Sequence, residues 1–351
     1  MTVLEDRYQL CPYMRIYDRL EPVLLPYMTF GVSPNFRSEV VNTDRHGFRL
    51  SFCHQQPIDS LSWWQASRRG LLLGGSFVFG VGSTTDRSTV VSQLGTHTGI
   101  AFLNLGIRAG NSLQELIAAL PFLSSADIVM VCSGMNTLIT HLQSLGMNEL
   151  YGPLFSEECF AVLSRQPLRE LANWIEHGGQ PIRLGRLVRT VGESVRRRLA
   201  SQNGTSPHPA SLQASSSRDF ATAMARAVQQ QERDLRVIAR VLPEKARLLF
   251  AVQPVAAGLR KTFLEEEVEL FRLNDCINAK IRRDQWMALK QHMVEYWPKY
   301  TELLQQMCQR LGVPFLDLNG LTYHGWCFVD QVHMTDEGQA QTAAHLASRL
   351  S

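Results

Sequence analysis

The fold is decided by the segment LLLGGSFVFG, residues 71–80, in which an apolar run of strand length meets two glycines and then Ser76. A short apolar run that ends at glycine is typical of a buried strand followed by a turn. Further runs of this kind alternate with helical stretches along the chain, which is the pattern of a parallel sheet covered on both faces. The sequence therefore predicts an α/β fold, a three-layer α/β/α sandwich.

The pattern supplies enough strands for a five-stranded parallel sheet. We expect strands at residues 71–74, 101–105, 127–132, 247–252 and 313–318. We expect helices at residues 88–98, 112–123, 219–242 and 287–311, with a last helix from about residue 335 to the end of the chain. Parallel strands need crossovers of a dozen or more residues, and the first two intervals supply these with one helix each.

Three regions follow from this pattern. Residues 1–69 are rich in aromatics and prolines and are interpreted as an N-terminal wrap on a main domain of residues 70–351. The third crossover is much longer and predicts a helical insertion, or cap, at about residues 140–245, with a Ser/Pro-rich linker at 201–217. Six arginines between residues 183 and 198 accompany the single acid Glu193. They are interpreted as a solvated helix face, and the alternative is a docking patch for an anionic partner such as an acidic carrier protein, a phosphate or a lipid headgroup.

Composition excludes several classes of protein. The chain has 351 residues, 45% hydrophobic and 19% charged, with a net charge of +3, so no general nucleic-acid or membrane-surface role follows from charge. We expect no signal peptide and no integral membrane segment, because charges interrupt the N-terminal 27 residues and no window reaches a spanning length. The seven cysteines lack metal-site spacing, and their odd number favours reduced thiols and a cytoplasmic protein. The oligomeric state is not predicted.

Near the C-terminus, the motif DQVH places Asp330 three residues before His333. A serine hydroxyl is a weak nucleophile unless a base removes its proton, and imidazole, with a pKa of about 6.5, suits that task at neutral pH. A carboxylate can orient the ring and stabilise the imidazolium. Ser76, His333 and Asp330 are therefore the candidate nucleophile, base and orienting acid. Asp317 and Asp336 are alternative acids that match the motif less well.

Two further motifs, IRAGNS with Gly110 and SGMN with Asn136, follow apolar runs of their own. In this order the blocks of Ser76, Gly110, Asn136 and Asp330 with His333 resemble the SGNH, or GDSL-like, hydrolase superfamily. The resemblance covers residues 71–351 outside the insertion and implies the flavodoxin-like SGNH hydrolase fold. The chain departs from the family in having Gly-Gly-Ser where G-D-S is common, and Gly-Met-Asn-Thr where G-x-N-D is common.

The resemblance implies an enzyme that cleaves an ester or thioester through an acyl-enzyme at Ser76, without a metal or cofactor. An oxyanion hole would come from the backbone N–H groups of Ser76 and Gly110 and the side-chain amide of Asn136, with about 3–4 kcal/mol for each donor. The expected substrate is a small-molecule or carrier-bound acyl compound. Two alternatives stay open: an acyltransferase that passes the acyl group to an alcohol or amine, and a non-catalytic binding module.

Other segments have a structural and a functional interpretation. DRHGFR, residues 44–49, resembles an N-x-x-G-F-R segment of some superfamily members, but a plain turn before a strand is favoured. Tyr323, Trp326 and Phe328 are interpreted as packing under the Asp330 loop, with an apolar wall for an acyl chain as the alternative. Asn111 or Ser112 is expected to cap a helix, and Cys132 to be a small buried hydrophobe.

Overall fold

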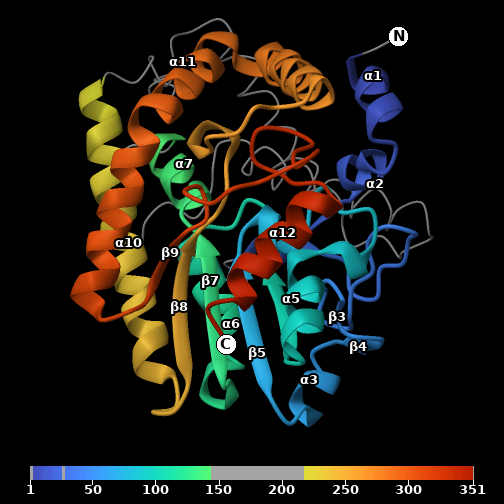
Figure 1. Ribbon diagram of the computed structural model, residues 1–351, viewed down its shortest axis with the longest axis vertical. Coiled ribbons are helices and arrows are strands. Elements are labelled where there is room, and N and C mark those ends of the chain that lie inside the picture. The colour runs from blue at the N-terminus through green and yellow to red at the C-terminus, as the bar shows by residue number, and fades with distance from the viewer. Residues whose placement is uncertain (1–2, 26–27, 144–216, 351) are drawn as a thin grey trace, which may run out of the picture. The chain divides into compact units, whose positions relative to one another are not determined.

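Five parallel strands form the central sheet of the computed structural model, which describes residues 3–25, 28–143 and 217–350 (Figure 1). The order is β6-β5-β7-β8-β9, and every neighbouring pair is parallel. The strands are β5 (Arg69–Gly74), β6 (Ala101–Gly106), β7 (Ile128–Ser133), β8 (Arg247–Val252) and β9 (Phe315–Asp317). The predicted fold class is confirmed, and the order is that of a flavodoxin-like doubly wound sheet. The last strand is shorter than expected.

Helices cover both faces of the sheet because successive side chains of each strand point to opposite sides. Leu71 and Leu73 lie in one buried cluster, whereas Leu72 lies in the other. The first cluster includes residues of α6 (Ser112–Ala119), α7 (Met135–Gln143), α10 (Ser217–Val241) and α11 (Glu265–Leu311). The second includes residues of α5 (Val90–Thr98) and α12 (Asp336–Ala347), which lie side by side in Figure 1. Each leucine buried in this way stabilises the fold by about 1.5–3 kcal/mol.

Helix α11 begins well before the expected start at residue 287 and runs for 47 residues. Its first turn carries three glutamates, which suit the positive end of a helix, and Glu267 accepts a hydrogen bond from the backbone N–H of Leu264. Leu270 packs with the N-terminal segment, whereas Trp297 and Tyr300 pack on the sheet. The two halves enter different buried clusters, so no single apolar stripe marks the whole helix.

The N-terminal 69 residues contain short elements: α1 (Val3–Leu10), α2 (Met14–Arg19), β1 (Pro22–Leu25), β2 (Met28–Val32), β3 (Ser51–Cys53), β4 (Gln56–Ile58) and α3 (Ser62–Gln65). β1 pairs with β2 and β3 with β4, both antiparallel. Met14, Tyr17 and Leu20 share a buried cluster with Phe79 and Val329. This segment therefore packs against Phe79, three residues after Ser76, and against Val329, the residue before Asp330.

The remaining short elements are α4 (Ser76–Phe79) and the 3-10 turns η1 (Asp86–Ser88), η2 (Leu123–Ser125) and η4 (Ala256–Gly258). Of the predicted insertion at about residues 140–245, the structure describes residues 140–143 at the end of α7 and residues 217–245, which include α10. The arginine segment 183–198 and nearly all of the linker 201–217 lie outside them. Among the helices of residues 3–143 and 217–350, none has the length and apolar character needed to cross a bilayer.

Candidate active site

The candidate residues follow the carboxyl ends of the strands. β5 ends at Gly74 and α4 begins at Ser76, β6 leads to Gly110, and β7 leads to Asn136. The segment with Asp330 and His333 follows β9 and precedes α12. The strands are parallel, so these ends meet at one edge of the sheet, which is where open α/β sheets place their ligand sites.

Ser76, His333 and Asp330 form a continuous chain of hydrogen bonds. Nε2 of His333 lies 2.7 Å from Oγ of Ser76, although the two residues are 257 positions apart. Nδ1 of the same ring lies 2.7 Å from Oδ2 of Asp330. When Nδ1 carries the proton, it donates to Asp330 and leaves Nε2 free to accept the proton of the serine hydroxyl. The geometry is that of a nucleophile, a base and an orienting acid.

Asp330 is 6% exposed and is held in its ionised form by its neighbours. Burial by itself raises the pKa of this carboxyl, but the charge of His333 and its hydrogen bond, with two backbone N–H groups, lower the pKa below its usual value. Those backbone groups belong to Val332 and His333, and both donate to Oδ1 at 2.9 Å. One oxygen of Asp330 therefore shapes the turn, and the other faces the imidazole.

The segment that carries His333 is fixed at both ends. The backbone N–H of Val329 donates to the carbonyl of His333 at 3.0 Å, and that of Thr335 donates to the carbonyl of Cys327 at 2.9 Å. On the other side, the buried carboxylate of Glu267 on α11 accepts from the backbone N–H groups of Cys327 and Phe328, at 3.0 and 3.1 Å. This rigid frame limits the movement of the imidazole relative to the sheet.

Asn136 and Gly110 lie next to each other, beside the residue that precedes Ser76. Nδ2 of Asn136 donates to the carbonyl of Gly110 at 2.9 Å, which leaves the second hydrogen of the amide for another acceptor. A Cβ atom on Gly75 would overlap Nδ2 of Asn136, so the amide lies directly against the residue that precedes Ser76. The second glycine of the Gly-Gly-Ser motif thus makes room for Asn136. The backbone N–H of Gly110 donates to the carbonyl of Ile107 at 3.0 Å.

A buried polar network that the sequence did not reveal lies behind Asn136. Ser133 donates to Oε1 of Glu115 at 2.8 Å, and Ser112 donates to Asp234 of α10 at 2.7 Å. The backbone N–H of Ser112 also donates to the hydroxyl of Thr137 at 3.1 Å. Complete burial raises the pKa of Glu115 to about 8; the hydrogen bond from Ser133 opposes this rise and the charge of Asp234 adds to it. The segments that follow β6 and β7 are thereby tied together.

The other residues singled out in the sequence have structural roles. Tyr323 and Phe328 are 4% and 0% exposed, and Phe328 packs against the rings of Phe263 and Phe271, so the packing interpretation is confirmed for both. Of the alternative acids, Asp317 binds Asn319 and Asp336 binds Thr84. Asn111 caps α6 in a capping box with Gln114. Cys132 is fully buried in β7, as expected.

Residues 44–49 form the expected turn before β3. Asp44 accepts hydrogen bonds from the backbone N–H groups of His46 and Phe48, at 2.8 and 3.0 Å. Among the residues that the structure describes, no group of three or more His, Cys, Asp or Glu side chains is placed to hold a metal ion.

The chain is similar to solved structures of esterases and lipases. An aryl esterase of M. smegmatis is 13% identical, with a TM-score of 0.38, over 81% of this chain and 98% of that one. A carbohydrate acetylesterase from Sinorhizobium meliloti is 11% identical, with a TM-score of 0.39 and coverage of 81% and 98%. An extracellular lipase from Streptomyces rimosus is 12% identical, with a TM-score of 0.39 and coverage of 80% and 100%. No protein-family model matches the chain, and no curated protein is significantly similar to it.

Proposed function

We propose that this protein is a serine hydrolase of the SGNH type that cleaves an ester or thioester through an acyl-enzyme on Ser76. The observation that carries the proposal is the placement of one imidazole, His333, at 2.7 Å from both Ser76 Oγ and Asp330 Oδ2. A serine and a histidine that are 257 positions apart in the sequence, with a buried carboxylate behind the ring, have the geometry that nucleophilic catalysis requires.

In the first half of the reaction, Oγ of Ser76 attacks the acyl carbon while Nε2 of His333 takes the hydroxyl proton. The tetrahedral intermediate collapses when the imidazolium gives that proton to the leaving alcohol or thiol, so the ester or thioester bond breaks and a serine ester remains. In the second half, His333 takes a proton from water, the hydroxide attacks the serine ester, and the proton returns to Ser76 as the carboxylic acid leaves. Asp330 stabilises the imidazolium in both halves.

Negative charge on the carbonyl oxygen needs donors that are already in place. We assign this role to the backbone N–H of Ser76 and to the free hydrogen of the Asn136 amide. Because Asn136 is oriented by the carbonyl of Gly110, Gly110 contributes through that carbonyl. The backbone N–H of Gly110, which donates to the carbonyl of Ile107, also donates to the substrate oxygen and is the third donor.

The test is labelling of the purified protein with a fluorophosphonate, read as the mass added to the intact chain. We expect one label on the wild type and none on Ser76→Ala or His333→Ala. Ser88→Ala is the matched control, because Ser88 lies in η1, where its hydroxyl contacts Thr85, and it should label as the wild type does. A wild-type protein that is folded and stays unlabelled contradicts the proposal and moves the non-catalytic binding module to the front.

The same residues serve an acyltransferase when an alcohol or amine replaces water in the second half of the reaction. Hydrolysis and transfer are separated by trapping the acyl-enzyme with a labelled short-chain thioester and measuring its decay in water with and without added alcohols and amines. Decay that an acceptor accelerates, with acylated acceptor as the product, identifies the transferase. The carrier-bound acyl donor, the domain division and the cytoplasmic location stay predictions from the sequence.

A further inference from the structure

The loop of residues 80–86 connects the helix that begins with Ser76 to the segment that carries His333. It follows directly on α4, the short helix that begins with Ser76. Its middle lies against the residues just after His333: a Cβ atom on Gly82 would overlap the carbonyl oxygen of Met334, and the backbone N–H of Thr84 donates to Asp336 at 2.8 Å. The position of this loop therefore affects where the histidine segment can lie.

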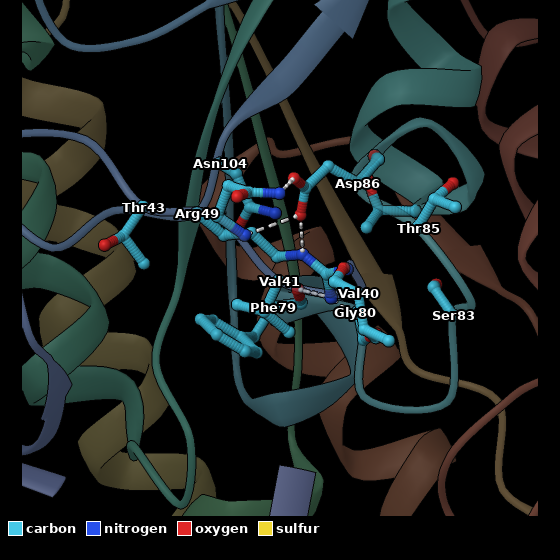
Figure 2. A network of polar contacts seen from close by, with 12 residues as sticks. Val40, Val41, Thr43, Arg49, Phe79, Gly80, Ser83, Thr85, Asp86 and Asn104 are labelled. Carbon is cyan, nitrogen blue, oxygen red and sulfur yellow. Dashed lines mark hydrogen bonds and ion pairs between the residues drawn. The ribbon is translucent and has the colours of Figure 1, made fainter. Parts of the chain in front are cut away.

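A buried arginine from the N-terminal segment holds both ends of this loop. The side chain of Arg49 is 0% exposed. Nη1 donates to the carbonyls of Phe79 and Gly80 at 3.1 and 2.8 Å, where α4 ends and the loop begins. Nε donates to Asp86 at 2.7 Å, where the loop ends. Figure 2 shows the guanidinium between Asp86 and Gly80, so a single rigid group spans the loop.

Tyr17 of α2 supports the same loop from the same side. Its hydroxyl oxygen lies 2.8 Å from the carbonyl of Gly80 and 2.7 Å from that of Ser83, and it accepts a hydrogen bond from Nη1 of Arg49 at 2.9 Å. The residue is 3% exposed. Two side chains that come from far outside the catalytic motifs thus converge on the backbone that separates Ser76 from the histidine segment.

Stability alone gives a poor account of this arrangement. Burying an ion pair such as Arg49 with Asp86 costs desolvation energy, and apolar residues of similar volume often stabilise a fold as well or better. What an apolar side chain cannot provide is a set of directed hydrogen bonds to chosen backbone carbonyls. Arg49 donates in addition to the carbonyl of Val40 at 2.7 Å, which anchors the guanidinium in the N-terminal segment.

We propose that Arg49 and Tyr17 are positioning residues of the Ser76 site, which hold the loop 80–86 so that Ser76 and His333 stay within hydrogen-bonding distance. This role rests on the proposed function. The N-terminal segment then contributes to the chemistry without touching the substrate. A catalytic pair displaced by about 1 Å loses roughly a hundredfold in rate, so small movements of this loop have measurable consequences.

The principal test removes one hydroxyl. Tyr17→Phe deletes the contacts to Gly80 and Ser83 and keeps the ring in the apolar cluster. Tyr8→Phe is the matched control, because it makes the same change in the same segment, where the hydroxyl donates to Asp18 at 2.8 Å and does not reach the loop. The measurement is the rate of fluorophosphonate labelling over a range of probe concentrations, which separates the maximal rate of inactivation from the affinity for the probe.

We expect Tyr17→Phe to lower the maximal rate about tenfold and leave the affinity for the probe unchanged, whereas Tyr8→Phe matches the wild type. Arg49→Lys keeps the charge but cannot reach Asp86 and the carbonyls together, and should lower the rate about a hundredfold. A folded Tyr17→Phe protein with the wild-type maximal rate overturns the positioning role. So does a variant whose labelled fraction falls only in proportion to its loss of folded protein. A wild-type protein that does not label refutes the proposed function, and the positioning role with it.

Discussion

Replacing Asp330 by asparagine tests whether this carboxylate orients the imidazole of His333 for the proposed reaction, with the exchange of one oxygen for an NH2 group. In the wild type, Oδ1 accepts from the backbone N–H groups of Val332 and His333, and Oδ2 faces Nδ1 of the ring. The amide oxygen of an asparagine is expected to keep the two backbone hydrogen bonds. Its NH2 group then faces Nδ1, which must accept, so the ring proton moves to Nε2 and blocks the base that Ser76 needs.

The opposite orientation of the amide is unfavourable. It would turn the NH2 group towards the two partly buried N–H donors of Val332 and His333 and leave both without this acceptor, at about 1 kcal/mol or more for each. The wrong tautomer is therefore the stable one. We expect the maximal labelling rate of Asp330→Asn to fall by about three to four orders of magnitude, or about 4–5.5 kcal/mol in activation free energy.

The assay is fluorophosphonate labelling of wild type and Asp330→Asn at pH 7.5, with the free energy of unfolding of both proteins measured in urea. The mutant should remain folded and label very slowly. A labelling rate within about threefold of the wild type would refute the reasoning, because it would mean that the imidazole keeps its function without the carboxylate.

Three other substitutions give separate expectations. In Gly75→Ala the new Cβ atom overlaps Nδ2 of Asn136, which should displace this donor and slow labelling about 100-fold. Gly320→Ala is the control, because a Cβ atom there has ordinary contacts with Asp317. Equal labelling rates of Gly75→Ala and the control would contradict the role of Asn136. Glu115 in the folded state, with its pKa raised by burial to about 8, keeps a proton that the unfolded chain releases near pH 4.5, so wild-type stability should fall by up to about 5 kcal/mol as the pH rises through this window. Urea unfolding at pH 5 and pH 8.5 should show this loss in the wild type and little of it in Glu115→Gln, and parallel losses would count against a buried neutral acid. Glu267→Ala removes the counter-charge of the buried ammonium of Lys261 and the acceptor of the N–H groups of Cys327 and Phe328, and should lower the free energy of unfolding by about 3–5 kcal/mol. A melting temperature within about 2 °C of the wild type would contradict the importance of these contacts.

The parts of the protein that follow from local patterns could be predicted from the sequence. The strands are short apolar runs that end at glycine or at polar residues, so β5, β7 and β8 were placed to within two residues of their observed bounds. Ser76 follows such a run, and Asp330 and His333 belong to the recognisable motif DQVH. Because parallel strands bring their carboxyl ends to one edge, the proximity of these residues followed from the fold class.

Contacts that depend on distant segments could not be predicted in this way. Arg49 belongs to a turn motif, but its burial depends on contacts with α2 and α4. No hydrophobic periodicity in the sequence predicts these contacts. Glu115 and Asp234 belong to helices whose polar residues would ordinarily face water, and only the packing of α10 against α6 encloses them. A usable signal was present in α6, where Gln114 and Glu115 interrupt an otherwise apolar helix. A helix that is apolar on nearly all sides is buried, and its few polar residues are then candidates for a buried network.

The shortness of β9 has a consequence for self-association. An edge strand exposes unpaired backbone groups that can recruit a strand from another molecule. β9 has only three residues, and it is preceded by Pro314, which has no N–H to donate. β8 begins three residues before its pairing with β9, and there Arg247 donates from its guanidinium to the carbonyls of Arg349 and Leu350. A strand from another molecule could therefore form only a very short hydrogen-bond ladder on this side of the sheet, beside a charged side chain. This disfavours edge-to-edge aggregation of the folded protein.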